Sequence, residues 1–221
     1  MPDPALAGSA ALLFLAGAAI AGLCLGLLAD VFVRRTLPHL AGRPGRAQRT
    51  TTAVAAAGLC ALLAWRFGPA PELPAFMLLA VIGVQLARID AIHHLLPNRL
   101  VMPLLGAGIV LLAAASLALG GWLSLARGIA GAVILFFFYF ILALISPKSL
   151  GMGDVKLAAP LGLYLGYLGW TQLFYGGALG FVAGGVVSLA LVLKNRGNKP
   201  NEVAFGPSML AAALITALVS A

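Results

Sequence analysis

The chain has 221 residues, of which 62% are hydrophobic and only 9% are charged. Its mean hydropathy of +1.06 lies far above that of soluble domains, which need more polar residues to cover their surface. The formal net charge of +8 does not indicate a nucleic-acid partner, because the basic residues are dispersed and no basic-aromatic module is present. The composition excludes a soluble globular enzyme and predicts a polytopic membrane protein.

Eight apolar runs are long enough, or nearly so, to cross a bilayer, which takes about 20 residues. They are Gly8–Val33, Thr51–Phe67, Pro74–Ile89, Leu100–Leu119, Ala126–Ile145, Leu157–Trp170, Gln172–Leu193 and Val203–Ala221. We therefore expect an all-α membrane protein of about eight transmembrane helices. Residues 1–73 would form an N-terminal two-helix segment with a short basic cytoplasmic loop, and residues 74–221 a six-helix membrane domain.

The positions of lysine and arginine predict the orientation of these helices. All of the 14 basic residues except Arg66 and Arg127 follow odd-numbered runs. Because basic loops stay in the cytoplasm, both termini are expected on the non-cytoplasmic side, with the loops contacting anionic lipid headgroups.

Two acidic residues lie beside the apolar runs, at the same predicted membrane face and at similar depth. Asp90 follows the third run, and Asp154 precedes the sixth. Ionisable residues at membrane depth are costly, so their default interpretation is functional. Simpler roles remain open at this point: Asp154 would suit a helix N-cap, and Asp90 could pair with Arg88 or His94.

Two carboxyl groups in close contact can share one proton and activate a water, the chemistry of aspartyl peptidases. Gly151 and Gly153 beside Asp154 would let the backbone depart from a helix and let a substrate strand approach closely. Lys156 would neutralise charge at the site or anchor to lipid. His93 and its neighbour are better explained as headgroup-level histidines than as metal ligands, and we expect neither a metal nor a cofactor.

Three short motifs carry a resemblance to the type IV prepilin peptidases. They are the GxGDxK pattern at Gly151-Met152-Gly153-Asp154-Val155-Lys156, an aspartate followed by a Pro-Asn turn at Asp90 and Pro97-Asn98, and the stretch Ala204-Phe205-Gly206-Pro207. The resemblance implies a GxGD-type intramembrane aspartyl endopeptidase that cuts the basic leader from prepilin or pseudopilin precursors, as in type IV pili and type II secretion. It implies Asp90 and Asp154 as the catalytic pair in a bacterial inner-membrane protein, and the remaining motif residues as binding or shaping the site.

The sequence departs from the family pattern in one place. Larger members carry a zinc domain with paired C-x-x-C motifs between the first two spans, where this chain has only a cysteine-free basic loop. Their N-methyltransferase activity is therefore left open here. Two other classes also remain as alternatives: a non-catalytic component of a pilus or secretion assembly, and an ion-coupled transporter. The sequence does not indicate the oligomeric state.

Overall fold

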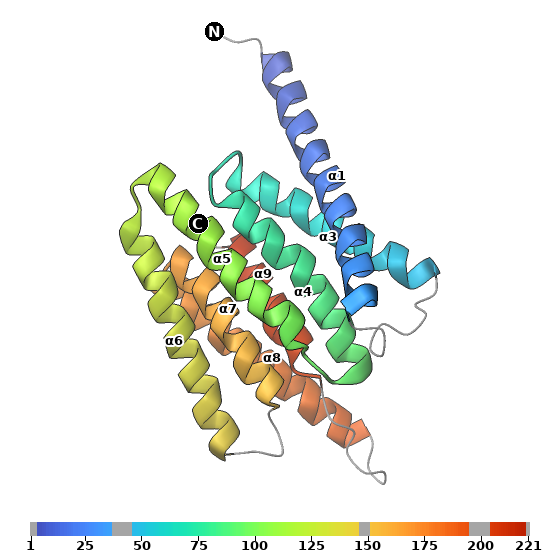
Figure 1. The fold of residues 1–221 in the computed structure, drawn as a ribbon, viewed down its shortest axis with the longest axis vertical. Coiled ribbons are helices and arrows are strands. Elements are labelled where there is room, and N and C mark those ends of the chain that lie inside the picture. Colours follow the sequence, from blue (N-terminus) through green and yellow to red (C-terminus); the bar gives the residue numbers. More distant parts are fainter. Residues whose placement is uncertain (1–3, 37–45, 146–150, 195–203, 220–221) are drawn as a thin grey trace. The chain divides into compact units, whose positions relative to one another are not determined.

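The computed structural model describes residues 4–36, 46–145, 151–194 and 204–219, and within these ranges every regular element is an α-helix. The predicted all-α class is confirmed, and each of the eight predicted runs coincides with a helix (Figure 1). The helices are α1 (Pro4–Thr36), α3 (Arg46–Phe67), α4 (Leu73–His93), α5 (Asn98–Leu119), α6 (Trp122–Ile145), α7 (Met152–Leu168), α8 (Trp170–Lys194) and α9 (Gly206–Val219).

Among the described residues, α1, α3, α4, α5 and α6 are each long and apolar enough to cross a membrane. The helix α9 is apolar but shorter, and α7 has 17 residues. The chain is thus a multi-pass membrane protein. Most of the predicted basic loop, and the predicted ends Val203 and Ala221, lie outside the described residues.

Several helices extend beyond the predicted runs by a turn or so, and two of these extensions include acidic residues. The helix α7 begins at Met152 rather than at Leu157, and α4 continues to His93 rather than ending at Ile89. Asp154 and Asp90 are therefore helical residues, not residues of loops beside the helices. Hydropathy alone misses these turns, because polar side chains interrupt the apolar run while the backbone stays helical.

The chain divides into two compact units, residues 1–85 and 86–221. The predicted domain division after residue 73 stays a prediction. In the first unit α1 packs closely on α3 at Gly22. A Cβ at this position would lie 2.9 Å from the carbonyl oxygen of Ala56, so the close contact needs a residue without a side chain. Near the end of α1, the buried Asp30 forms ion pairs with Arg34 at 3.0 Å and Arg49 at 3.1 Å. Asp30 thus pairs with one arginine of its own helix and with one arginine of α3.

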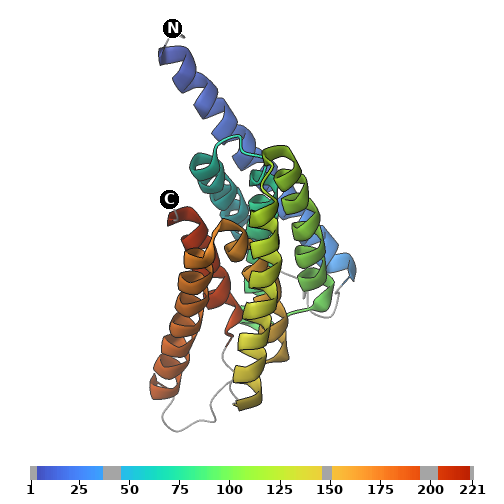
Figure 2. The same ribbon diagram turned by 90° about the vertical axis from the view of Figure 1, so that its left-hand side faces the viewer.

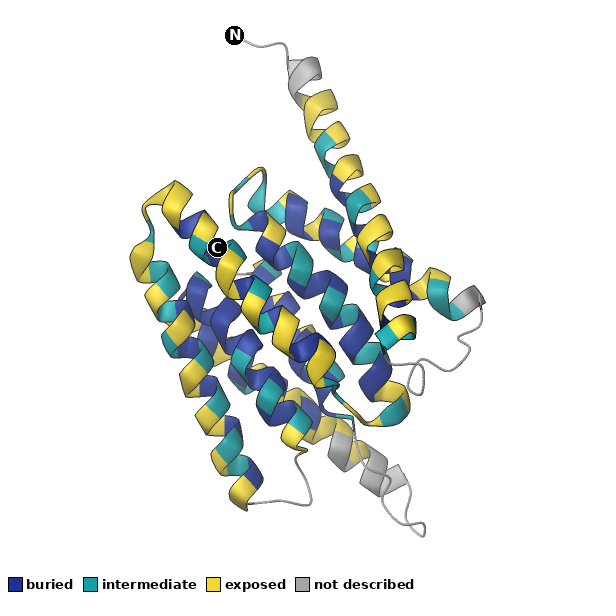
Figure 3. Cartoon of the chain, viewed as in Figure 1, coloured by how far each residue is buried: buried dark blue, intermediate teal, exposed yellow. Residues whose placement is uncertain are grey.

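In the second unit α7 is the central helix, in contact with α5, α6, α8 and α9. Most of its residues are buried, whereas α6 exposes many of its own (Figure 3). The backbones of α6 and α7 approach closely through glycines: a Cβ at Gly166 would lie 2.7 Å from the carbonyl oxygen of Arg127. On another side of α7, α8 and α9 lie side by side (Figure 2). Small residues that bring backbones together are a common basis of helix packing in membranes.

Candidate active site

Asp90 lies in the last turn of α4 and is buried, with 4% of its surface exposed. The helix ends at His93, and the next residue, His94, has a left-handed φ of 51° while its N–H still donates to the carbonyl oxygen of Asp90 at 2.8 Å. The Asp90 carboxylate Oδ2 accepts a hydrogen bond from the backbone N–H of Gly206 at 2.9 Å. Gly206 is the first residue of α9, so the carboxylate uses one of the amides that a helix N-terminus leaves unpaired.

Asp154 lies in the first turn of α7 and is also buried, with 8% of its surface exposed. The N-cap of α7 is Gly151, so the suggested N-cap position for Asp154 is wrong. Asp154 instead accepts a hydrogen bond on Oδ2 from the N–H of Gly151 at 3.3 Å. Its other oxygen, Oδ1, is buried without a hydrogen-bond partner among the described residues. Capping therefore accounts for one oxygen of this carboxylate and leaves the second unexplained.

The two acids lie at one place in the second unit. The charge of Asp90 acts on Asp154, and the side chain of Leu96 packs beside one glycine next to each acid. The methyl carbon Cδ1 of Leu96 lies 3.4 Å from the position of a Cβ on Gly153 and 3.4 Å from that of a Cβ on Gly206. Gly153 precedes Asp154, and Gly206 binds Asp90. Leu96 thus packs beside both the glycine that precedes Asp154 and the glycine that binds Asp90.

The Phe205-Gly206-Pro207 stretch has a steric explanation. A Cβ at Gly206 would lie 2.7 Å from Oδ2 of Asp90, so only glycine lets the amide reach the carboxylate undisturbed. Pro207 follows in the first turn of α9, where a missing N–H costs no helical hydrogen bond. The ring of Phe205 is buried against the backbone of Gly184 and anchors this segment to α8.

The predicted role of Gly153 in breaking the helix is wrong, because Gly153 is a helical residue of α7. What it provides is space, since a Cβ there would lie 3.0 Å from Cβ of Leu96. Leu96 carries no polar signature and was not among the predicted site residues. In this part of the motif, glycine therefore allows the side chain of Leu96 to approach the backbone of α7 closely.

Lys156 and Asn98 connect two of the sequence motifs. The ammonium group of Lys156 donates a hydrogen bond to Oδ1 of Asn98 at 3.2 Å, on the exposed side of the site. Pro97 is the N-cap residue of α5, and its carbonyl oxygen accepts the N–H of Leu100 at 3.0 Å. The Pro-Asn turn thus starts α5 and holds the first turn of α7 beside it.

Tyr139 of α6 is a further residue at the site that the sequence analysis missed. It is fully buried at 1% exposure and interacts electrostatically with Asp154. Its hydroxyl group lies 3.6 Å from the position of a Cβ on Gly180. In the sequence, the only feature that distinguishes Tyr139 from its neighbours is its hydroxyl group within the run Phe136-Phe137-Phe138-Tyr139-Phe140. Without the fold, such a tyrosine cannot be told from a lipid-facing aromatic residue.

Comparison with known proteins agrees with this arrangement of motifs. The type IV leader peptidase family matches residues 77–189, which include Asp90 and Asp154. The prepilin leader peptidase/N-methyltransferase of Stutzerimonas stutzeri is 30% identical over 165 residues, covering 72% of this chain and 54% of that protein. The protein of the same name from Aeromonas hydrophila is 32% identical over 149 residues, covering 65% of this chain and 49% of its own length.

A third relative is shorter than this chain and is covered over most of its length. The leader peptidase HopD of Escherichia coli is 32% identical over 146 residues, covering 65% of this chain and 91% of that protein. The chain spans about half the length of the first two relatives. No solved structure matches it significantly. The matched residues cover half of the chain, and on that basis the protein belongs to the type IV leader peptidase family.

Proposed function

We propose that this protein is a membrane aspartyl endopeptidase that removes the basic leader from prepilin-like precursors, with Asp90 and Asp154 as its catalytic pair. The observation that carries the proposal is the placement of two buried carboxylates, each bound by a glycine amide at the start of a helix, with Leu96 packed beside Gly153 and Gly206. Burying two carboxylates in an apolar helical unit is costly, which is difficult to explain by a structural role alone. Because the two acids lie near each other, they can act together as a catalytic pair.

The reaction needs one ionised and one protonated carboxyl group. The ionised member takes a proton from a water whose oxygen attacks the scissile carbonyl carbon, while the protonated member gives its proton to the carbonyl oxygen. When the tetrahedral intermediate collapses, the C–N bond breaks and the first acid passes its proton to the leaving amine. The second acid recovers its proton from the intermediate, so both return to their starting states.

Each of the two carboxylates has one oxygen held by a backbone amide. An amide already occupies Oδ2 of Asp90, and another occupies Oδ2 of Asp154. Asp154 Oδ1 is buried and accepts no hydrogen bond within the described part of the chain, which leaves it available to a water. This oxygen is a position where a water or the scissile carbonyl can bind.

The names of the relatives and the charge distribution support the choice of substrate and membrane. Several relatives are named prepilin leader peptidases, and the basic residues favour placing the acids at the cytoplasmic face of a bacterial inner membrane. A precursor with a basic cytoplasmic leader and an apolar membrane helix presents its cleavage junction at that depth. We propose peptidase activity alone, because no cysteine pair lies between α1 and α3 to hold the zinc domain of the larger enzymes.

The test is cleavage of a prepilin-like precursor by the purified protein in liposomes, with the products identified by mass spectrometry. Wild type should cut once at the leader junction, with or without EDTA, and Asp154→Asn should be inactive while unfolding at the wild-type temperature. Glu72→Gln, which neutralises an acid of the first unit, serves as the matched control and should remain active. Absence of cleavage by folded wild type would refute the peptidase and favour an assembly component or a transporter.

A further inference from the structure

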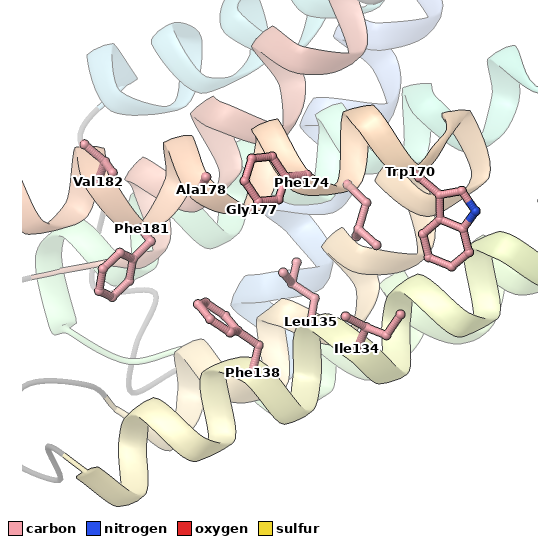
Figure 4. Close-up of a pocket in the computed structure, with 10 residues that line it drawn as sticks. Ile134, Leu135, Phe138, Trp170, Phe174, Gly177, Ala178, Phe181 and Val182 are labelled. Atoms are coloured by element: carbon pink, nitrogen blue, oxygen red, sulfur yellow. The ribbon is translucent and has the colours of Figure 1, made fainter.

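An apolar groove runs along the surface of the second unit between α6 and α8. It has a volume of about 480 Å³, and ten residues line it, all of them apolar. Figure 4 shows Ile134 and Phe138 of α6 facing Phe174 and Phe181 of α8 across it. The rims carry large exposed aromatic side chains, with Phe174 70% and Trp170 52% exposed.

The groove has a defined direction. On α8 its lining extends from Trp170, the first residue of the helix, to Val182. At 1.5 Å per residue this is about 18 Å, more than half of the hydrocarbon thickness of a bilayer. The groove therefore follows the helix axis through much of the apolar zone.

One end of the groove leads to the aspartates. The ring of Phe181 lies 6.4 Å from the ring of Phe138, which closes the groove, and 6.3 Å from the ring of Phe205. Phe205 immediately precedes Gly206, whose N–H binds Asp90. A continuous path of contacts thus links the end of the groove to a proposed catalytic carboxylate.

Small residues form the α8 wall between the aromatic ones. Gly177 and Ala178 line the groove, and a Cβ at Gly177 would already lie 2.9 Å from a methyl group of Leu135. The space beside Gly177 is thus filled by α6, and Ala178 is the small residue that this wall presents to the groove. Small residues let helices pack closely within membranes.

Resting on the proposed function, we propose that this groove binds the apolar helix that follows the scissile bond in the substrate. A chain that crosses the apolar zone must be helical, because its backbone groups find no other partners there. A helix seated between α6 and α8 would start beside Phe181 and would place the residues preceding it next to Asp90. A lipid acyl chain would fill the same volume, but it would not require the groove to lead to Asp90.

The test compares two substrates: a full-length precursor in liposomes, and a short soluble peptide that carries only the leader and the junction. Ala178→Phe fills the groove, whereas Ala183→Phe makes the same change on an exposed part of α8 outside it. We expect Ala178→Phe to lower the ratio of kcat/KM for the precursor to that for the peptide by at least about tenfold, and Ala183→Phe to leave it unchanged. An unchanged ratio in both variants overturns the groove assignment, while wild type that cuts neither substrate refutes the proposed function itself.

Photocross-linking provides a measurement that does not depend on a bulky variant folding. A benzophenone amino acid in place of Phe174 points into the groove, and one in place of Phe137 serves as the control, since Phe137 is 54% exposed on α6 but does not line the groove. Position 174 should cross-link to the apolar helix of an uncut precursor bound to Asp154→Asn, and position 137 should not. Cross-links from position 174 only to lipid, or only to a second copy of this chain, would overturn the proposal.

Discussion

Gly206→Ala is a small change that moves Asp90 without removing any polar or charged group from the site. The new methyl carbon would lie 2.7 Å from Oδ2 of Asp90 and 3.2 Å from its Cγ, where ordinary contacts are 3.4–4 Å. The carboxylate must move away, and it then loses the 2.9 Å hydrogen bond from the Gly206 amide. No charged or polar side chain is removed, so any effect on activity comes from the position of Asp90.

The size of the effect follows from that hydrogen bond. A hydrogen bond to a charged group contributes about 1.5–3 kcal/mol, and every 1.4 kcal/mol of transition-state stabilisation changes the rate by about tenfold. We therefore expect kcat/KM to fall by about 10- to 150-fold. The fold should survive, because Gly206 is the first residue of α9 and alanine is favoured over glycine in a helix by up to about 1 kcal/mol.

The assay is the initial rate of precursor cleavage in liposomes, alongside thermal unfolding in detergent. Gly185→Ala is the matched control, because a Cβ at Gly185 meets nothing within 4 Å. Wild-type activity in a folded Gly206→Ala protein would refute the idea that the Gly206 amide positions Asp90. An unfolded variant would show instead that the contact is needed for stability.

Three further changes test other parts of the structure. Asp30→Asn leaves two arginines, each about one third exposed, without their buried counter-charge; denaturation should show a loss of about 1–3 kcal/mol with the activity of the folded protein retained. Gly162→Ala places a methyl group against the backbone of Gly131 between α6 and α7 and should lower the free energy of unfolding by about 1–3 kcal/mol, measured against Gly185→Ala. Lys156→Gln weakens an exposed hydrogen bond to Asn98 and should change kcat/KM by less than about fivefold.

Each of these changes has an outcome that contradicts its premise. Unchanged stability in Asp30→Asn would show that the ion pairs between α1 and α3 contribute nothing. Wild-type stability in Gly162→Ala would mean that α6 and α7 separate freely. Complete loss of cleavage in a folded Lys156→Gln protein would give the lysine a direct part in the reaction.

Much of the fold follows from hydropathy, because a helix that crosses a membrane must be apolar over most of its length. All eight predicted runs are helices, with ends shifted by a few residues. One shift adds a turn to the start of α7, where Gly153, Asp154 and Lys156 interrupt the apolar pattern. These residues form the site, so the local rule fails where function places polar groups in a helix.

The two aspartates and the glycines around them could be identified from the sequence, but their contacts could not. The hydrogen bond from Gly206 to Asp90 joins residues 116 positions apart. The shared contact with Leu96 depends on how three segments pack, and leucine is too common in this chain to mark a site. The electrostatic interaction of Tyr139 with Asp154 likewise depends on the pairing of α6 with α7.

The most direct test of the central claim is whether Asp90 and Asp154 act as one unit. It compares kcat/KM for precursor cleavage by Asp90→Asn, Asp154→Asn and the double variant, each verified to be folded by its unfolding temperature. If the acids share one reaction, each single variant loses nearly all cleavage and the double variant loses no more than either, because residues that act together are not additive. Measurable cleavage by either folded single variant, or a double loss equal to the product of two partial losses, would contradict the catalytic pair.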